Sequence, residues 1–174
     1  MCFVDAAADV EDYQQHFDPI CEAIATAIAP VGGEVDEALH VIGKCSWFGG
    51  PDDMGVSPSE GLAFLYEVED KPMVFLPNQP PNTTGLARRL DPDKHYIAMR
   101  WDYDRFDKDR LAGKEVAMVY APKTGKRVLC HPADWGPHVD TGRVADLSPG
   151  AMQELGIETD DEVHVVYPHK GKKK

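Results

Sequence analysis

Short extended runs that end at glycine or proline constrain the fold of this chain more than any other feature of its sequence. The 174 residues include 15 glycines and 14 prolines, so the chain must turn often and few segments are long enough for a helix. Extended or alternating runs lie at 39–48, 61–68, 95–101, 114–120, 127–131, 144–147 and 161–167. The sequence therefore predicts a mainly β fold of short strands joined by turns.

Two helices are expected beside these strands. Apolar residues between Phe17 and Ile28 recur at helical spacing, with Asp18 and Pro19 suited to a helix start. We therefore expect an N-terminal helical segment over 1–38 and a β domain over 39–168. A second, short helix is predicted from 149 to 155, because Ser148 and Pro149 suit its first turn and Gly156 its end.

Two stretches lack the periodicity of regular structure. The segment 71–93 contains five prolines and several Asn and Thr residues, so it is expected to be a long loop inserted into the β domain. Residues 169–174 form a basic tail, which we interpret as a solvated end without a function.

Net charge restricts the partners of this chain. The formal charge is −12 at pH 7, and such a surface repels nucleic-acid phosphates. No apolar run reaches membrane-spanning length, and residues 1–10 lack the basic start of a secretory leader. We therefore expect no nucleic-acid partner and no membrane insertion, and the cellular location stays open.

The C-terminal half carries a motif. Residues 133–138 read Ala-Asp-Trp-Gly-Pro-His, and 141–149 read Thr-Gly-Arg-Val-Ala-Asp-Leu-Ser-Pro. This order resembles the Asp-Arg-Gly-Pro and Asp-Leu-Ser signature of rare lipoprotein A and the expansins, with Trp135 where that family has arginine. The strand at 43–49, Glu60 and the turn at 123–126 fall in the matching order. The resemblance covers about three quarters of the chain and implies a six-stranded double-psi β-barrel.

The same resemblance implies an activity and its residues. Asp134 matches the acid that protonates a glycosidic oxygen in the lytic members, Glu60 matches a second acidic position, and Asp102 is a further candidate carboxylate. The resemblance implies a cell-wall polysaccharide, first of all peptidoglycan, cleaved by a lytic transglycosylase or a glycosidase without a cofactor. Two alternatives stay open: an expansin-like module that binds or loosens polysaccharide without cleavage, and a phage-associated structural protein that keeps only the barrel.

Aromatic residues are the candidates for contacting a sugar. Trp47, Trp101, Tyr103 and Trp135, together with His138, are the candidates to line the groove; some of the aromatic residues must belong to the core, and Phe48 is expected to face it. Stacking of a sugar on a tryptophan face would hold the substrate beside the acid.

Several residues have a structural interpretation that we favour over a catalytic one. Asp146 is expected to accept backbone hydrogen bonds inside the barrel, and Asp53, which lies close to glycines, to form a turn. His131, His138 and Asp140 have irregular spacing, so no metal site is expected.

The cysteines leave two alternatives open. Cys45 could act as a nucleophile with His131, but a buried strand residue is the favoured interpretation. Cys45 and Cys130 are expected to be near one another, and a disulfide between them is neither predicted nor excluded.

Overall fold

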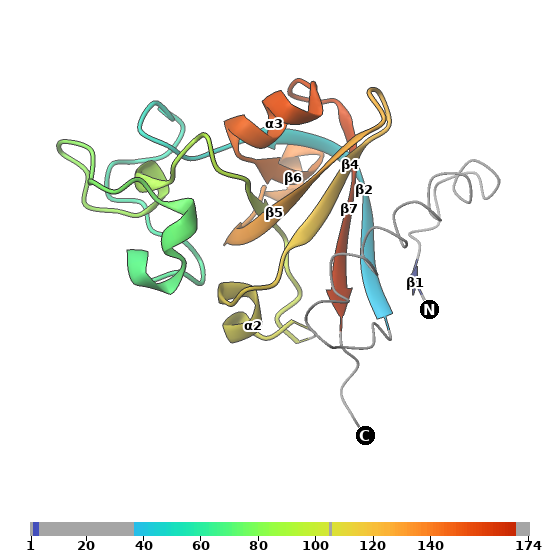
Figure 1. Ribbon diagram of the computed structural model, residues 1–174, viewed down its shortest axis with the longest axis horizontal. Helices are drawn as coiled ribbons and strands as arrows, with labels where there is room; N and C mark the ends of the chain where they lie inside the picture. The colour runs from blue at the N-terminus through green and yellow to red at the C-terminus, as the bar shows by residue number, and fades with distance from the viewer. Residues whose placement is uncertain (1, 4–36, 105, 170–174) are drawn as a thin grey trace.

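Six strands close into a mixed β-barrel in the computed structural model, which describes residues 2–3, 37–104 and 106–169 (Figure 1). The predicted mainly β fold is confirmed, whereas the predicted N-terminal helix lies outside the described residues. The strands of the barrel are β2 (Glu37–Trp47), β3 (Tyr96–Met99), β4 (Ala117–Ala121), β5 (Lys126–Trp135), β6 (Arg143–Leu147) and β7 (Glu162–His169). A two-residue strand, β1 (Cys2–Phe3), pairs in parallel with the beginning of β2.

The ring of pairings runs β2–β6–β3–β5–β4–β7 and returns to β2. The pairs β2–β6 and β3–β5 are parallel, and the other four pairs are antiparallel. Strands β4 and β5 form a hairpin whose turn contains Gly125 at a φ of +70°, as the sequence predicts. Each strand of the ring is paired with two others, and the beginning of β2, before its pairing with β6 starts at Lys44, also pairs with β1.

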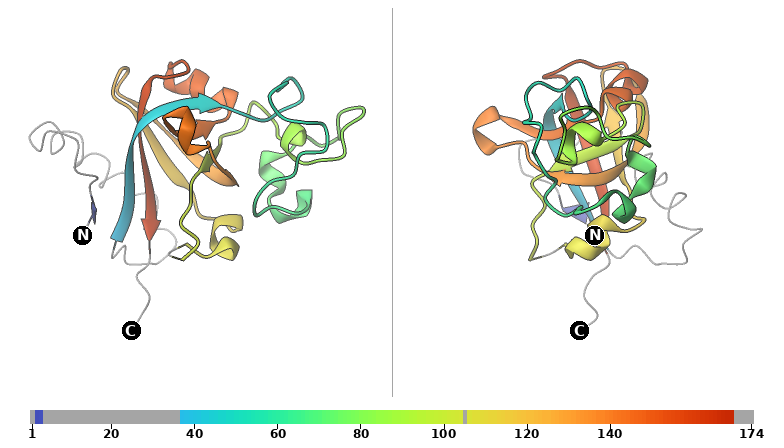
Figure 2. Two further views of the ribbon diagram at one scale, coloured as in Figure 1. Left: turned by 180° about the vertical axis from the view of Figure 1, so that it is seen from behind. Right: turned by 90° about the vertical axis from the view of Figure 1, so that its left-hand side faces the viewer.

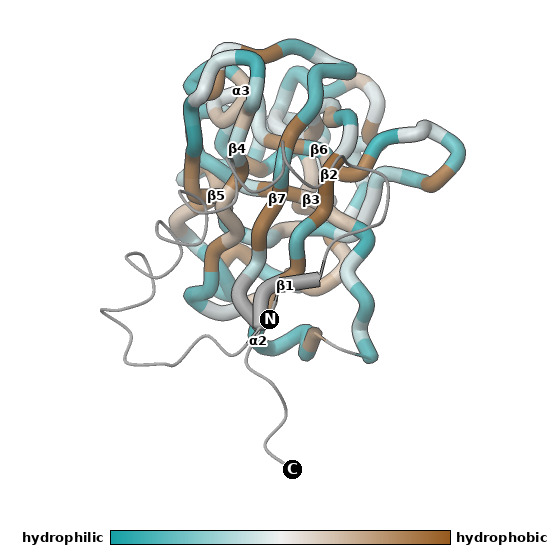
Figure 3. Tube along the Cα trace, turned by 90° about the vertical axis from the view of Figure 1, so that its right-hand side faces the viewer, coloured by the Kyte–Doolittle hydropathy of each residue, from teal (hydrophilic) through white to brown (hydrophobic). Residues whose placement is uncertain are grey.

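The core fills the inside of this ring. On β6, Ala145 and Leu147 are fully buried while Asp146 between them is only half-buried, because successive side chains of a strand project to opposite faces. Hydrophobic residues gather along the strands and hydrophilic ones in the loops (Figure 3). Phe48 is 8% exposed, as expected for a core residue.

Helices are few. The structure has α2 (Lys108–Ala112), α3 (Pro149–Leu155) and 3-10 turns at Val68–Asp70, Pro72–Val74, Ala87–Arg89 and Val139–Thr141. Helix α3 begins and ends where the sequence predicts: the Ser148 hydroxyl accepts a hydrogen bond from Ala151 N, and Gly156 ends the helix at a φ of +70°. No helix among the described residues is long and apolar enough to cross a membrane.

The loop insertion is larger than the sequence predicts. The whole segment from 48 to 95 contains no strand, and it extends from one side of the barrel (Figures 1 and 2). The extended run predicted at 61–68 is therefore not a strand. Its apolar residues Leu62, Phe64 and Leu65 are buried in the core cluster instead.

Lys71 anchors the insertion to the barrel. Its side chain is 1% exposed, and Nζ donates hydrogen bonds to the backbone oxygens of Leu111 (2.7 Å) and Pro132 (2.8 Å). Burial lowers the pKa of Lys71 to about 8, and the charge of Glu115 opposes this. One ammonium group thus joins the insertion to the last residues of α2 and to β5.

Replacing Lys71 with methionine should lower the free energy of unfolding by about 2–4 kcal/mol, because two buried carbonyl groups lose their donor. The pKa of Lys71 is about 8 in the folded protein and 10.5 in the unfolded chain, so between these pH values the unfolded chain binds more protons. The free energy of unfolding of the wild type therefore rises with pH across this range. Urea unfolding should show the gap between wild type and Lys71→Met widening across that range. The exposed Lys114→Met serves as control, and an equal loss there would contradict the assignment.

Candidate functional site

Asp134 lies near the end of β5, where the barrel meets the insertion. One carboxylate oxygen, Oδ1, accepts hydrogen bonds from the backbone N–H groups of Ala63 (2.7 Å) and Trp135 (2.8 Å). Burial raises the pKa of Asp134, the two N–H donors oppose the rise, and the charge of Glu60 adds to it. No group among the described residues donates a hydrogen bond to Oδ2.

Asp146 lies in the middle of β6. Burial raises the pKa of Asp146 to about 6; the charges of Asp53 and Asp134 add to the rise, and Arg143 and Arg100 oppose it. Within the described part of the chain its carboxylate accepts no hydrogen bond, so the expectation that it accepts backbone hydrogen bonds inside the barrel is not met. Half-burial without hydrogen-bond donors favours the protonated form of a carboxyl group.

The two aspartates project from the same face of the sheet. Ala98 on β3 is the register partner of Asp134 on β5 and also of Asp146 on β6. On its other side, Asp146 is paired with Ser46 on β2. Register partners on adjacent strands project to the same face. Because the neighbours of Asp146 on β6 face the core, this face is the outer one.

The spacing of this row leaves room between the acids. Two interstrand steps of about 4.8 Å put the backbones of Asp134 and Asp146 about 10 Å apart, and the side chain between them is only the methyl group of Ala98. Carboxyl groups on such backbones can reach the separations used by glycosidases, which are about 5–9.5 Å. The arrangement therefore places two carboxyl groups of different pKa on one face, on either side of the buried Ala98.

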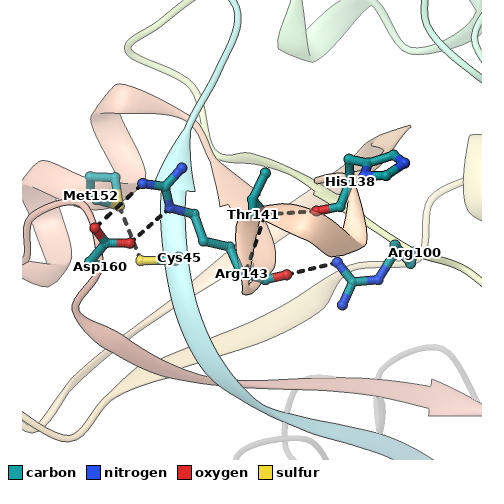
Figure 4. Close-up of polar contacts among 7 residues, drawn as sticks. All are labelled: Cys45, Arg100, His138, Thr141, Arg143, Met152 and Asp160. Carbon is teal, nitrogen blue, oxygen red and sulfur yellow. Dashed lines mark hydrogen bonds and ion pairs between the residues drawn. The ribbon is translucent and has the colours of Figure 1, made fainter.

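Neither nearby arginine neutralises Asp146 through an ion pair. The guanidinium of Arg143 binds Asp160, with Nε 2.9 Å from Oδ1. Arg100 donates from Nη1 to the backbone oxygens of Pro137 (2.8 Å) and Arg143 (2.7 Å). Figure 4 shows the Arg143 guanidinium at Asp160 and the Arg100 guanidinium at the backbone oxygen of Arg143. They lower the pKa of Asp146 only from a distance, so the rise caused by burial prevails.

The other predicted carboxylates occupy turns. Glu60 is exposed, and its Oε2 accepts a hydrogen bond from Ser57 N (3.2 Å). Its negative charge nevertheless contributes to the raised pKa of Asp134. Asp102 is exposed, and its Oδ1 accepts from Asp104 N (3.0 Å). Asp53 is buried and binds the N–H groups of Gly49 and Gly55, as expected for a turn former. Of these, Glu60 is the predicted assisting carboxylate that the structure brings near Asp134.

The predicted aromatic residues separate into three locations. Trp101 is 2% exposed and packs against Phe106 and Tyr167, so it offers no face to a ligand, contrary to expectation. Trp135 is 43% exposed, and its indole Nε1 donates to the Trp101 backbone oxygen (3.1 Å). Trp47 is also 43% exposed but follows Ser46, so its side chain projects to the face opposite the aspartates. Trp135 is the exposed tryptophan that follows Asp134 directly at the end of β5, whereas Trp47 lies at the end of β2.

His138 is exposed beyond the end of β5. Its Nδ1 accepts a hydrogen bond from Asp140 N (3.3 Å) and lies 3.4 Å from the Asp140 carboxylate. Burial lowers the pKa of His131, with further lowering by Lys71 and His95. No three potential ligands gather as a metal site within the described residues.

Tyr103 was a sequence candidate for the floor of the groove, and Tyr66 was not. Burial raises the pKa of Tyr103, and the charge of Asp134 and the proximity of Tyr66 add to the rise. Tyr66 is 76% exposed and Tyr103 is 37% exposed. Tyr66 comes from a loop without periodicity, so no sequence signal pointed to it.

The thiols are chemically inert. Cys45 and Cys130 are buried and free, so the disulfide that the sequence left open is not formed. Burial raises the pKa of Cys45 to about 12 and also raises the pKa of Cys130. Cys45 Sγ instead contacts Met152 Sδ at 3.7 Å (Figure 4). A thiol with so high a pKa is unsuited to the nucleophile's role.

Fold and site together define a closed mixed β-barrel with two carboxyl groups on its outer face. No protein-family model matches the chain, and no curated protein matches it. The function is therefore argued from the site itself.

The carboxyl carbon of Asp146, followed by NMR as pH is varied, should titrate near pH 6. Asp134→Asn should lower that pKa, because it removes a like charge on the same face. Asp102→Asn, which removes an exposed charge in a turn, should leave it unchanged. A titration midpoint for Asp146 near 4 in the wild type would contradict this electrostatic assignment.

Asp146→Asn should stabilise the protein at alkaline pH. The folded pKa of Asp146 lies above its unfolded value, so ionisation costs stability as pH rises from about 4 to 6. At pH 8 the variant should melt at least about 2 °C higher than wild type. The difference should vanish below pH 4, where both chains carry a neutral group. Exposed Asp140→Asn is the control, with no such pH dependence.

Proposed function

We propose that this protein cleaves the glycan strands of a cell-wall polysaccharide, with peptidoglycan as the first candidate. The observation that carries the proposal is the pairing of Asp146 and Asp134 on both sides of Ala98, with a pKa of about 6 for Asp146. Glycoside cleavage needs one carboxyl group that is protonated near neutral pH and a second that is ionised.

The fold supports this proposal through its topology. Two parallel pairs in an otherwise antiparallel ring of six strands agree with a double-psi barrel, which the motifs around Asp134 and Asp146 imply. We infer this barrel type, and with it the resemblance to rare lipoprotein A and the expansins. The argument for cleavage rests on the acids and not on the fold.

The environments of the acids suggest different roles. Burial raises the pKa of both acids, but Asp146 lacks hydrogen-bond donors and its pKa rises to about 6, so it would donate the proton to the glycosidic oxygen. Asp134 accepts two backbone N–H bonds, which favour its ionised form, so it would stabilise the positive charge that develops on the sugar. The resemblance to rare lipoprotein A implies that Asp134 is the proton donor. The pKa of about 6 for Asp146 instead favours Asp146 as the proton donor and Asp134 as the ionised carboxylate.

The bond then breaks by one of two routes. After protonation, the leaving sugar departs with the proton on its oxygen, and the cationic sugar is captured either by its own hydroxyl or by water. Capture by the sugar's hydroxyl gives an anhydro end, and capture by water gives a reducing end. Glu60, whose charge reaches Asp134, is a candidate base for either capture.

One observation favours a second function. Asp134 Oδ1 holds the insertion through Ala63 N, which is a structural task that does not require chemistry. With Trp135 and Tyr66 exposed, the end of β5 and the insertion that Asp134 holds would suit a module that binds polysaccharide without cleaving it.

Incubation with purified peptidoglycan, cellulose and chitin, followed by mass spectrometry of the soluble products, tests both functions. We expect products from peptidoglycan, with a rate that falls as pH rises through about 6. Asp146→Asn should lower the rate at least about 100-fold and Asp134→Asn about tenfold or more, whereas Asp93→Asn should retain it.

The outcomes separate the functions. Sedimentation with insoluble glycan without soluble products would support the binding module and overturn the cleavage proposal. Cleavage that survives both aspartate substitutions would show that the acid pair is not the catalytic site.

A further inference from the structure

A pocket of about 570 Å³ lies between the end of β2, the loop that follows it and helix α3. Its apolar surface comes from Trp47, Met152, Ile157 and the prolines Pro51, Pro92 and Pro149. Its polar groups belong to Asp52, Gln153, Glu158 and Thr159. The volume is within the range of small-ligand sites, which is about 300–1,000 Å³.

The pocket is independent of the acid pair. Trp47 and Ser46 are successive residues of β2, and Ser46 shares the face of Asp146. The Trp47 side chain therefore projects to the opposite face, toward α3. A ligand bound here would not occupy the surface between Asp134 and Asp146.

The walls are held rigidly. Gly49 and Gly50 have φ values of +79° and +91°, and Gly50 N donates to the Ala87 backbone oxygen (3.0 Å). Asp53 fixes the same turn by accepting a hydrogen bond from Gly49 N (2.7 Å). The pocket therefore exists before a ligand arrives, which reduces the entropy lost on binding.

Charge decides the kind of ligand. Asp52 and Glu158 are exposed, and neither carboxylate makes an ion pair within the described residues. No lysine, arginine or histidine lines the pocket. The charge of Glu158 acts on Lys123, which ion-pairs with Asp161. Two carboxylates without an ion pair of their own, beside an exposed indole, suit a cation, which gains from the carboxylates and from the π face of the ring. Apolar Met152 and Ile157 suit an aliphatic chain that carries this cation.

We propose that this pocket binds a lysine side chain presented by a peptide. The four methylene groups lie along Trp47 and Met152, and the ammonium group contacts Asp52 and Glu158 at the rim. An amine is preferred to a neutral sugar, because the lining offers acceptors in excess of donors.

The probe is Nα-acetyl-lysine N-methylamide, titrated into the full chain and followed by the indole N–H resonances of the tryptophans. We expect the Trp47 resonance to shift, while those of Trp101 and Trp135 stay fixed, since both donate hydrogen bonds to backbone oxygens away from the pocket. The norleucine analogue keeps the aliphatic chain without the ammonium group and should bind at least about fivefold more weakly.

Variants assign the contacts. Asp52→Asn combined with Glu158→Gln should weaken lysine binding about fivefold or more, whereas Glu154→Gln, on α3 but outside the pocket, should not. Unchanged Trp101 and Trp135 resonances report that each variant is folded.

The proposal is overturned if norleucine binds as tightly as lysine, if diacetylchitobiose shifts Trp47 and lysine does not, or if no probe shifts it. Glycan cleavage is measured separately, so its failure would leave this result unaffected.

Discussion

The short strand β3 is the constraint on which the candidate site depends. It pairs in parallel with β5 and antiparallel with β6, and both registers meet at Ala98. A shift of either register by one residue would turn an aspartate toward the core. The bulge between Ile97 and Ala98 sets the register that places Asp134 opposite Ala98. Asp134 and Asp146 are twelve positions apart in the chain, but in the sheet they are separated by Ala98 alone.

The electrostatics of the site follow from what surrounds the acids. Arg143 is occupied by Asp160 and Arg100 by two carbonyl groups, so Asp146 stays half-buried without a counter-ion at contact. Such a group lowers the stability of the folded protein at neutral pH. A catalytic role would account for this loss of stability, because a catalytic acid needs a pKa near the pH at which the enzyme works.

Local signals in the sequence predicted local structure. Ser148, Pro149 and Gly156 sufficed for α3, and Gly125 for the β4–β5 turn, because caps and turns depend on adjacent residues. Burial depends on segments far apart, and there the sequence was insufficient. Trp101 was expected at the surface but lies against Tyr167 of β7. The raised pKa of Asp146 likewise requires burial and charges from residues 53 and 134, which no local pattern contains.

Alternation along β2 explains how one strand can serve two sites. Ser46 belongs to the row that contains Asp146, and Trp47 belongs to the pocket beside α3. Because the two side chains project to opposite faces, a ligand in one site does not touch the other. They share the backbone of β2, whose end is fixed by the hydrogen bond from Phe48 N to the Leu147 backbone oxygen (3.0 Å). A peptide held at Trp47 could therefore tether a substrate to the barrel without obstructing the aspartates.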